Sequence, residues 1–384
     1  MKASSASESL DVPTQMLQER DSAYACWEAD GRQLTALDLF SGAGGFSLGL
    51  EKAGFRVLGA ADVWNVAAES YRANFQHPIA ICDLATTSGK SLLKQLGIKN
   101  PSMDLLVGGP PCQGFSIQRI GGDHDARNNL VLEFARLVLE IGPRLFIMEN
   151  VPGLLGKRGV DLINEFVSRL KKGGYEVAST VINAADCGVP QLRKRVIFTG
   201  WKAGQPVFRL QPPQQSPSSY RTVASAFQGL PNPPVDLSPH PADMLHRRTR
   251  LSPLNQRRIE LIPPGGGMQD LPDELKVNCH KVGADKIGHR YVYGRLSPDR
   301  PAATITARFD SFTRGKFGHP IEPRNITLRE GARLQSFPDS FKFFGSQEEI
   351  AAQIGNAIPP LAAESVARAA AAHLTTHSDV VDRS

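Results

Sequence analysis

Short apolar runs alternate with amphipathic stretches along the chain between residues 34 and 201. The apolar runs predict strands at residues 34–40, 56–62, 79–82, 103–108, 144–150, 176–182 and 195–200. The amphipathic stretches between them predict helices near residues 45–53, 66–75, 128–141 and 160–172. Strands and helices that alternate in this way are typical of a mostly parallel sheet with helices on both faces. The pattern therefore predicts an α/β fold of the doubly wound type.

The pattern changes after residue 201. Residues 202–310 contain 15 of the 28 prolines and few helical periods. They also carry 15 lysine and arginine residues against 9 aspartate and glutamate residues, a net charge of +6 that equals the net charge of the whole chain. Such a region suits a polyanionic partner, although a solvated insertion with a basic surface would have the same composition.

Regular structure is predicted again near the end of the chain. Thr327, followed three residues later by Glu330, has the capping-box pattern of a helix start, so we expect a helix over residues 327–336. Two prolines at positions 359 and 360 precede an alanine-rich stretch, which predicts a last helix over residues 361–373.

Composition excludes several classes of protein. Hydrophobic residues make up 41% of the chain, enough for a packed core, yet no apolar run is long enough to cross a membrane. The polar start of the chain lacks the pattern of a signal peptide. The five cysteines are widely spaced and include no CxxC pair, so neither a disulfide framework nor a metal site is expected. We therefore expect a cytoplasmic protein.

A glycine-rich turn, DLFSGAGGF at residues 38–46, follows the first predicted strand and precedes the first predicted helix. Its glycines permit a sharp turn and the close approach of a ligand to the helix N-terminus. Asp62 and Asp83 end the second and third strands, where carboxylates can bind ribose hydroxyls or an adenine amino group. This pattern favours a nucleotide-like cofactor, but a tight turn without a ligand and ordinary capping acids are open alternatives.

A second loop, GGPPCQGFS at residues 108–116, follows the strand predicted at residues 103–108. Cys112 therefore lies at the carboxyl end of a strand, where α/β sheets place their sites. A single cysteine is usually a small core residue, but two prolines precede this one and Gln113-Gly114 follow it. Such a loop would hold a thiol in a fixed and accessible position, which suits a nucleophile.

Five blocks of the sequence occur in the order found in the DNA (cytosine-5) methyltransferase family. The blocks are the turn at residues 40–46, PPCQ at 110–113, ENV at 149–151, QLRKR at 191–195 and GN at 355–356. The chain resembles the bacterial modification methyltransferases most, over about residues 34–201 and 302–374. The resemblance implies methyl transfer from S-adenosylmethionine to C5 of cytosine in duplex DNA, at a specific sequence.

The resemblance also implies a division of the chain. We expect a polar lead-in at residues 1–33 and a catalytic and cofactor-binding domain of the S-adenosylmethionine-dependent methyltransferase type at residues 34–201. A smaller, irregular target-recognition domain is expected at residues 202–310. Residues 311–374 would complete the catalytic domain, and residues 375–384 would form a tail.

Four catalytic residues are implied. The thiolate of Cys112 would add to C6 of the cytosine, and Glu149 would contact N3 and the exocyclic amine. Arg193 and Arg195 lie two residues apart, so on a strand they would share one face, and such a pair can bind the nucleotide's phosphate and the base O2. A solvated loop acid and an arginine ladder on the surface are the alternatives. The residues expected to support the catalytic loop are Pro111, Gln113, Ser116, Asn150 and Gln191, with Asn150 holding the loop at 110–112.

The cofactor-binding residues implied by the resemblance are Phe40, Gly42, Gly44, Gly45, Asp62, Asp83, Leu84, Pro110 and Asn356. Phe40 would stack on or beside the adenine, and Asn356 would return from the C-terminal part of the chain. The last helix would then pack beside the first glycine-rich helix. Asp62 departs from the family pattern, which more often has glutamate followed directly by an aromatic residue. Here Val63 follows and Trp64 comes one position later.

The reacting carbon is stacked inside the duplex, so the base must be flipped out. The polar loop at residues 116–128 would fill the gap in the duplex. The candidate DNA-binding residues are Arg127, Arg247, Arg248, Arg250, Arg308 and Arg314, because arginine binds both phosphates and guanine. We expect a monomer, with a restriction endonuclease that acts on the same site as a plausible companion.

Three alternative functions share part of this sequence pattern. A tRNA cytosine-5 methyltransferase would share the catalytic blocks, but a long, basic, proline-rich region fits duplex DNA better. A catalytically inactive DNA-binding homologue would usually lose Cys112 or Glu149, and both are present. A nicotinamide-dependent oxidoreductase would leave the PPCQ loop unexplained.

Overall fold

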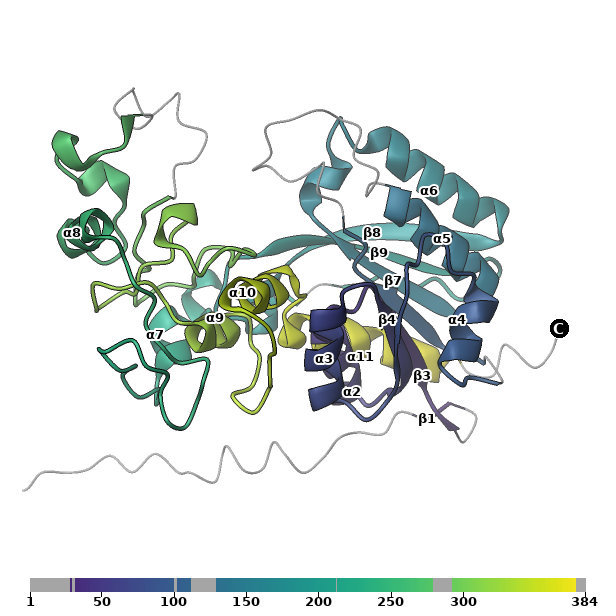
Figure 1. Cartoon of the computed structure of the whole chain (residues 1–384). Coiled ribbons are helices and arrows are strands. Elements are labelled where there is room, and N and C mark those ends of the chain that lie inside the picture. The colour runs from purple at the N-terminus through teal and green to yellow at the C-terminus, as the bar shows by residue number, and fades with distance from the viewer. Residues whose placement is uncertain are drawn as a thin grey trace, which may run out of the picture.

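The computed structural model describes residues 28–29, 32–99, 102–111, 129–211, 213–278 and 292–377 (Figure 1). At its centre is a seven-stranded sheet with the strand order β5-β4-β3-β6-β7-β9-β8. The strands are β3 (Thr35–Leu39), β4 (Arg56–Asp62), β5 (Ile79–Ile81), β6 (Leu105–Gly108), β7 (Leu145–Asn150), β8 (Tyr175–Asn183) and β9 (Lys194–Lys202). The strands from β3 to β7 pair in parallel, and β9 is antiparallel to both β7 and β8. A small hairpin, β1 (Glu28–Ala29) and β2 (Arg32–Gln33), precedes the sheet.

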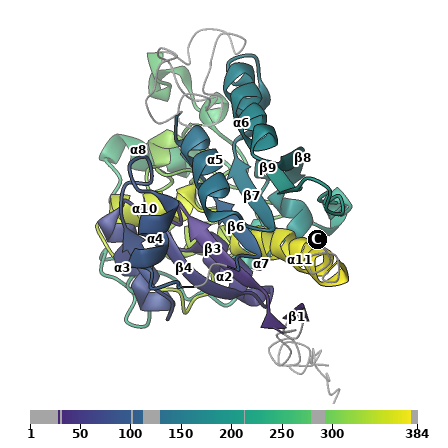
Figure 2. The same cartoon turned by 90° about the vertical axis from the view of Figure 1, so that its right-hand side faces the viewer.

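Helices cover both faces of this sheet, because successive strand residues point to opposite sides (Figure 2). On one face, Leu106 and Phe146 pack with α4 (Gly89–Gln95), α5 (Leu130–Ile141) and α6 (Val160–Lys172). On the other face, Leu105 and Ile147 pack with α2 (Gly45–Lys52) and α11 (Pro360–Thr376). The remaining helix of this part, α3 (Asn65–Asn74), lies between β4 and β5 in the chain. The predicted α/β architecture is confirmed.

The end of the chain returns to its first long helix. A Cβ atom added to Gly49 of α2 would lie 2.4 Å from the Cβ atom of Ala363 in α11 and 2.6 Å from the backbone nitrogen of Glu364. Only glycine permits this approach of the two helices. Arg368 of α11 also donates a hydrogen bond to the carbonyl of Lys52, at 2.9 Å. The predicted packing of the last helix beside the glycine-rich helix is confirmed.

A second lobe contains α7 (Val223–Phe227), α8 (Pro253–Leu261), α9 (Leu328–Leu334) and α10 (Gln347–Asn356) (Figure 1). Its main core also includes Ala68 and Tyr71 of α3, so the two lobes share buried side chains. Phe309 belongs to this core, and its ring occupies the space where a Cβ atom of Gly331 in α9 would lie. The boundary expected between residues 310 and 311 thus falls inside a continuous core. A separate cluster around Ile259 and Phe312 surrounds α8.

The sequence pattern did not predict several of the short helices. Four helices, α4, α7, α8 and α10, are missing from the predicted set, and each has 10 residues or fewer. Their starts nevertheless carry signals, because Ser252 caps α8 before a proline and Ser346 forms a capping box with Glu349 in α10. In contrast, β4 and α6 begin and end where they were predicted. Among the described residues, no helix is both long and apolar enough to cross a membrane.

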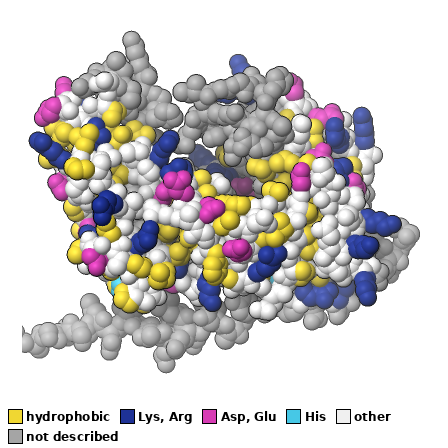
Figure 3. Space-filling view, viewed as in Figure 1, with side chains coloured by type: hydrophobic (Ala, Val, Ile, Leu, Met, Phe, Trp, Pro, Cys, Tyr) yellow, Lys and Arg dark blue, Asp and Glu magenta, His cyan; other side chains and the backbone are white. Residues whose placement is uncertain are grey.

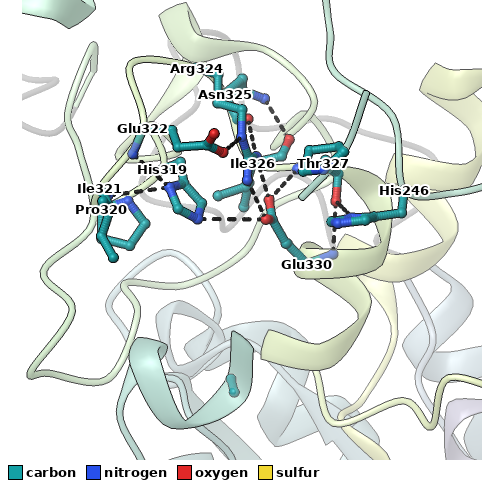
Figure 4. A network of polar contacts seen from close by, with 12 residues as sticks. His246, His319, Pro320, Ile321, Glu322, Arg324, Asn325, Ile326, Thr327 and Glu330 are labelled. Atoms are coloured by element: carbon teal, nitrogen blue, oxygen red, sulfur yellow. Dashed lines mark hydrogen bonds and ion pairs between the residues drawn. The ribbon is translucent and has the colours of Figure 1, made fainter. Parts of the chain in front are cut away.

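A buried polar network stabilises the second lobe (Figure 4). Arg324 donates to both carboxylate oxygens of Glu330, at 2.8 and 2.7 Å. Glu330 also accepts a hydrogen bond from the backbone nitrogen of Thr327, completing the predicted capping box, and His246 lies 2.8 Å from the Thr327 hydroxyl. Burial raises the pKa of Glu330, but the hydrogen bonds and charge of Arg324 outweigh it, so the pKa is lowered. Glu330 is therefore ionised at neutral pH.

Replacing Glu330→Gln should lower the free energy of unfolding by about 3 kcal/mol, because it removes the more deeply buried of the two carboxylates that pair with the buried guanidinium of Arg324 and leaves only Glu322 as its counter-charge. Urea denaturation at pH 7 measures this loss. The matched control is Glu348→Gln, whose carboxylate pairs with Arg308 but is 66% exposed, and it should cost less than about 1 kcal/mol.

The stabilisation by Glu330 should also depend on pH. Since the folded-state pKa is lowered, the stabilisation is present above the unfolded pKa and is lost as the pH falls through the folded value. The difference between Glu330→Gln and the wild type should therefore shrink in acid. An equal loss for Glu330→Gln and Glu348→Gln at pH 7 would contradict the role of burial.

Candidate active site

The carboxyl ends of four parallel strands meet at one edge of the sheet. Each of the predicted motifs follows or ends one of these strands: Phe40 follows β3, Asp62 ends β4, Pro110 follows β6 and Glu149 lies near the end of β7. Residues that are far apart in the sequence are thereby brought to one side of the molecule. This edge is where ligands bind in open α/β sheets.

The three glycines of the turn after β3 have different surroundings. A Cβ atom added to Gly42 would meet nothing within 4 Å, so this residue faces open space. A Cβ atom on Gly44 would lie 2.3 Å from the ring of Phe75, and one on Gly45 would lie 2.4 Å from the carbonyl oxygen of Ile358. Gly42 therefore leaves room for a ligand, whereas Gly44 and Gly45 let the turn pack against the rest of the protein. Phe40 itself has a positive φ of 56°.

Asp62 stabilises the turn through hydrogen bonds. Its Oδ2 accepts a hydrogen bond from the backbone nitrogen of Gly42 at 2.7 Å, and its Oδ1 accepts one from the nitrogen of Trp64 at 2.8 Å. Burial raises the pKa of Asp62, although these backbone hydrogen bonds oppose the shift. Val63, beside it, is 66% exposed. The direct contact of Asp62 with a ribose stays a prediction.

The other predicted cofactor residues differ in their accessibility. Asp83 is exposed, and its Oδ1 accepts a hydrogen bond from the nitrogen of Ala85. The side chain of Leu84 is buried in the core, and its carbonyl accepts a hydrogen bond from Arg136, so it supports the strand end and does not face the open edge. Asn356 is exposed at the end of α10, close to the turn because Gly45 packs on the next two residues, Ala357 and Ile358.

Glu149 and Arg195 form an ion pair across neighbouring strands. Nε of Arg195 lies 2.7 Å from Oε1 of Glu149, and the two side chains are 15% and 13% exposed. A Cβ atom on Gly109 would lie 3.5 Å from the other carboxylate oxygen, so the carboxyl group is next to the loop that leads to Cys112. Asn150 donates a hydrogen bond from Nδ2 to the carbonyl of Pro110 at 3.0 Å. This is the contact that we expected between Asn150 and the loop.

Arg193 does not form an exposed pair with Arg195. Its guanidinium is buried and donates to the carbonyl of Ile305 at 2.9 Å and to that of Ala357 at 3.0 Å. Burial and the charge of Arg195 lower its pKa, while Glu149 opposes this. Its Nε is buried without a hydrogen-bond partner among the described residues. A surface ladder is therefore excluded, and both terminal nitrogens of Arg193 are bound to backbone.

Gln191 also differs from its expected role. Its side chain is fully buried, accepts a hydrogen bond from the nitrogen of Ile305 and donates to the carbonyl of Leu334 and to the side chain of Gln335. The expectation that Gln191 supports the loop at 110–113 is wrong, because its hydrogen bonds go to the second lobe. Gln335 in turn donates to the carbonyl of Ile354. Sequence reasoning missed Gln335, and only its place after the capped helix α9 could have suggested it.

Pro111 is exposed at the end of this described segment. Four predicted site residues, Cys112, Gln113, Ser116 and Arg127, lie outside the described residues. Within the described part of the chain, no group of three or more histidine, cysteine, aspartate or glutamate side chains could hold a metal ion.

The arginines predicted to bind DNA differ in whether their guanidinium groups are already bound to other residues. Arg248 is bound to the carbonyl of Pro233 and to Glu322, and Arg308 is paired with Asp310 and Glu348. Arg247 is exposed and reaches Gln347, at 3.3 Å. Arg250 and Arg314 are exposed and make no side-chain hydrogen bond or ion pair with other described residues. These last two have free guanidinium groups that a partner can bind.

Two basic residues near the site were missed. Lys157 and Arg158 are both exposed in the turn between η3 (Pro152–Leu155) and α6, eight and nine residues after Glu149. The turn is tight, because a Cβ atom on Gly159 would lie 2.0 Å from the carbonyl oxygen of Leu154. Their position shortly after the ENV block was an available signal. In the space-filling view, the surface between the two lobes is hollowed, and charged side chains of both signs lie along it (Figure 3).

Comparisons with known proteins agree with this geometry. A family model described as C-5 cytosine-specific DNA methylase matches residues 34–372. The chain is 36% identical to Type II methyltransferase M1.HphI of Haemophilus parahaemolyticus, over 88% of this chain and 86% of that protein. It is 35% identical to Type II methylase M.HgiDII of Herpetosiphon aurantiacus, over 84% of this chain and 91% of that protein.

Solved structures show the same likeness. The chain resembles a protein from E. coli that is described as a DNA modification methyltransferase encoded within a prophage, with 28% identity and a TM-score of 0.63. That match covers 88% of this chain and 98% of the other. The DNMT2 of Spodoptera frugiperda, at 17% identity and a TM-score of 0.53, shares the fold, over 88% of this chain and 99% of the other.

Proposed function

This chain belongs to the C-5 cytosine-specific DNA methylase family, and we propose that its reaction takes place where β6 and β7 end. It is a DNA (cytosine-5-)-methyltransferase that transfers a methyl group from S-adenosylmethionine to cytosine C5 in a sequence-specific manner. The observation that supports this location best is the ion pair of Glu149 with Arg195, beside the loop that leads to Cys112. A carboxylate and a guanidinium that are largely buried at a strand end suit the recognition of a polar base.

The residues at the neighbouring strand ends fit S-adenosylmethionine. Gly42 has no atom within 4 Å of an added Cβ, so the open side of the turn can receive a ligand at the N-terminus of α2. Asp62 and Asp83 would supply acceptors for hydroxyl and amino groups, and Phe40 an apolar face. When bound, S-adenosylmethionine supplies an electrophilic methyl group.

Cytosine C5 is a weak nucleophile, so the chain's own residues must activate it. The thiolate of Cys112 adds to C6, which makes C5 electron-rich. Once C5 has gained the methyl group, it loses its proton, and the bond between C6 and the sulfur of Cys112 breaks to release the thiolate. Glu149 binds N3 and the exocyclic amine, and a proton shared with the ring there neutralises the charge that develops. Arg195, already 2.7 Å from Glu149, is placed to bind the base O2 as well. Asn150 keeps the loop before Cys112 in position through the carbonyl of Pro110.

Arg193 acts mainly by positioning other parts of the protein. Its terminal nitrogens hold the carbonyls of Ile305 and Ala357, so its main role is to position the second lobe against the sheet. Its Nε, which is buried and has no hydrogen-bond partner among the described residues, is a donor left for the substrate.

Duplex DNA lies between the lobes in this proposal, with the target base flipped out and the loop at residues 116–128 filling its place. Target recognition is assigned to residues 202–310, which share the second lobe with α9 and α10, and catalysis to residues 34–201 with residues 311–374. The enzyme acts as a monomer in the cytoplasm, alongside a restriction endonuclease that cuts the same sequence. The Type II methyltransferases among its relatives support this last point.

Incubation with methyl-labelled S-adenosylmethionine and unmethylated bacterial genomic DNA tests the reaction. Bisulfite sequencing should then find 5-methylcytosine within one short recurring sequence, because a sequence-specific enzyme modifies only its own target. Label in tRNA and none in DNA would contradict the substrate. Absence of label from both, together with no binding of S-adenosylmethionine, would favour an inactive homologue.

Replacing Cys112→Ser should reduce turnover by roughly 10³-fold or more, because it removes the nucleophile, while S-adenosylmethionine still binds. Glu149→Gln should reduce turnover by roughly 10²–10⁴-fold with little loss of DNA affinity, because it removes a proton-sharing group. Single-turnover methylation and calorimetric binding measure these effects. Glu165→Gln, at an exposed position of α6 paired with Arg169, is the matched control and should be fully active. A Cys112→Ser variant with normal activity would overturn the mechanism.

The free basic residues should contribute to the salt dependence of DNA binding. Replacing Arg250 and Arg314 together by alanine, or Lys157 and Arg158 together, should each reduce the slope of log K against log salt by about 2, since each phosphate contact contributes about 1. Fluorescence anisotropy with a duplex at several salt concentrations measures the slope. Lys94→Ala, on the exposed face of α4, is the control and should leave the slope unchanged. Slopes equal to that of the wild type in both double variants would place the DNA elsewhere.

A further inference from the structure

A chain of hydrogen-bonding groups leads from the surface to a carboxyl group buried beneath the turn after β3. Asp38 is 1% exposed, and its Oδ2 accepts a hydrogen bond from the Ser47 hydroxyl at 2.7 Å. The Ser47 oxygen lies 2.7 Å from the hydroxyl of Tyr71, which lies 3.0 Å from Nδ1 of His77. Nε2 of His77 lies 3.3 Å from Oε1 of Glu51, whose side chain is 41% exposed. Ser47, Tyr71 and His77 thus lead from Asp38 to Glu51, whose side chain is exposed to solvent.

This chain is compatible with either protonation state of Asp38. When Asp38 is ionised, Tyr71 donates to Ser47, and Ser47 donates to the carboxylate. When Asp38 is protonated, it donates to Ser47, Ser47 donates to Tyr71, and Tyr71 donates to Nδ1 of His77. Hydroxyl groups can rotate to donate in either direction, so both arrangements satisfy Ser47, Tyr71 and Nδ1 of His77, whereas Nε2 of His77 contacts Glu51 without forming a hydrogen bond with the described residues. The buried carboxyl group can therefore exchange a proton with solvent without opening the core.

Four other ionisable groups face Asp38 or this chain: Asp62 on β4, Glu51 on α2, Tyr71 on α3 and His77 after it. None of them places a permanent positive charge beside Asp38. Burial raises the pKa of Asp38 to about 7, the hydrogen bonds from Ser47 oppose this, and the charge of Asp62 adds to it. Both protonation states are thus populated near neutral pH.

Asp38 lies close to the turn, and its charge interacts with a residue that binds the turn. It lies on β3, two residues before Phe40, which follows the strand. Gly44 in the turn packs on the rings of Tyr71 and Phe75, so the turn lies directly over the chain of hydroxyl groups. Asp62, which binds the nitrogen of Gly42, also acts on Asp38 through its charge. A charge that arrives at the turn therefore acts on Asp38.

We infer that Asp38 loses its proton when a cation occupies the turn, and that it thereby favours the sulfonium cofactor over the product with its uncharged sulfur. The inference rests on the proposed position of S-adenosylmethionine at this turn. S-adenosylmethionine carries a sulfonium cation, whereas S-adenosylhomocysteine has a neutral thioether. An ionised carboxylate in the protein interior stabilises a nearby cation far more than it would in water. The proton that Asp38 releases travels through Ser47, Tyr71 and His77 to the solvent, and an equal proton returns once the product has replaced the cofactor.

Calorimetric titration in two buffers of different ionisation enthalpy counts the protons that binding releases. Asp38 is about half protonated at pH 7, so the wild type should release up to about half a proton with S-adenosylmethionine and none with S-adenosylhomocysteine. Affinity for S-adenosylmethionine should rise about tenfold from pH 6 to pH 8, while affinity for the product stays flat. An analogue with an ammonium group in place of the sulfonium should behave like the cofactor.

Two variants separate this role from a structural one. Asp38→Asn should abolish the proton release and flatten the pH profile. Ser47→Ala removes a hydrogen bond that lowers the pKa of Asp38, so the midpoint of the profile should move to higher pH. Ser70→Ala is the matched control: this buried serine donates to Gln353 and not to the chain, so its profile should equal that of the wild type. If Asp38→Asn fails to fold, the shift in Ser47→Ala still decides.

Equal proton release with cofactor and product, or a Ser47→Ala profile identical to that of the wild type, would overturn the inference and leave the methyltransferase assignment intact. Failure of the wild type to bind either ligand would instead contradict the proposed function and this inference together.

Discussion

Buried backbone carbonyls at the junction of the two lobes are the constraint on which the rest of the structure depends. The segments around Ile305, Leu334, Ile354 and Ala357 pass through the interior without forming strands, so their polar groups need partners. Gln191, Arg193 and Gln335 supply the donors, and all three side chains are buried. An unsatisfied carbonyl here would cost about 1–3 kcal/mol, so the junction is stable only with all three side chains in place. Because Gln191 and Arg193 directly precede β9, the same residues join the second lobe to the strand that carries Arg195.

Some basic residues of the second lobe serve a similar purpose. Proline has no backbone N–H, and residues 202–310 contain 15 of the chain's 28 prolines, so this region is short of backbone donors. Arginine has five donors, and Arg295 binds the carbonyls of Ile262, His319, Pro320 and Ile321. Part of the positive charge of this region is therefore bound inside the lobe and is not available to a polyanionic partner. Composition alone could not distinguish the two uses.

The sequence predicted the sheet well, and the second lobe poorly, for a physical reason. Strand β4 has seven residues and helix α6 has 13, so each is long enough for the spacing of its apolar residues to reveal it. Helices α7 and α8 have only five and nine residues, which is too short for a clear apolar period. The motifs at the strand ends could be located because each follows a predicted strand. What could not be predicted was which side chains face the ligand, as Leu84 and Gln191 demonstrate.

The contrast between Arg193 and Arg195 shows why the spacing of residues along the sequence is insufficient to predict their partners. The two residues have the same charge and are two positions apart, yet Arg195 pairs with Glu149 on the adjacent strand and Arg193 with backbone. The carbonyls that bind Arg193 belong to residues 112 and 164 positions further along the chain. A local pattern contains no information about such partners. The different environments of the two arginines, one paired with the carboxylate of Glu149 and the other bound to the carbonyls of Ile305 and Ala357, therefore arise only when distant parts of the chain have packed together.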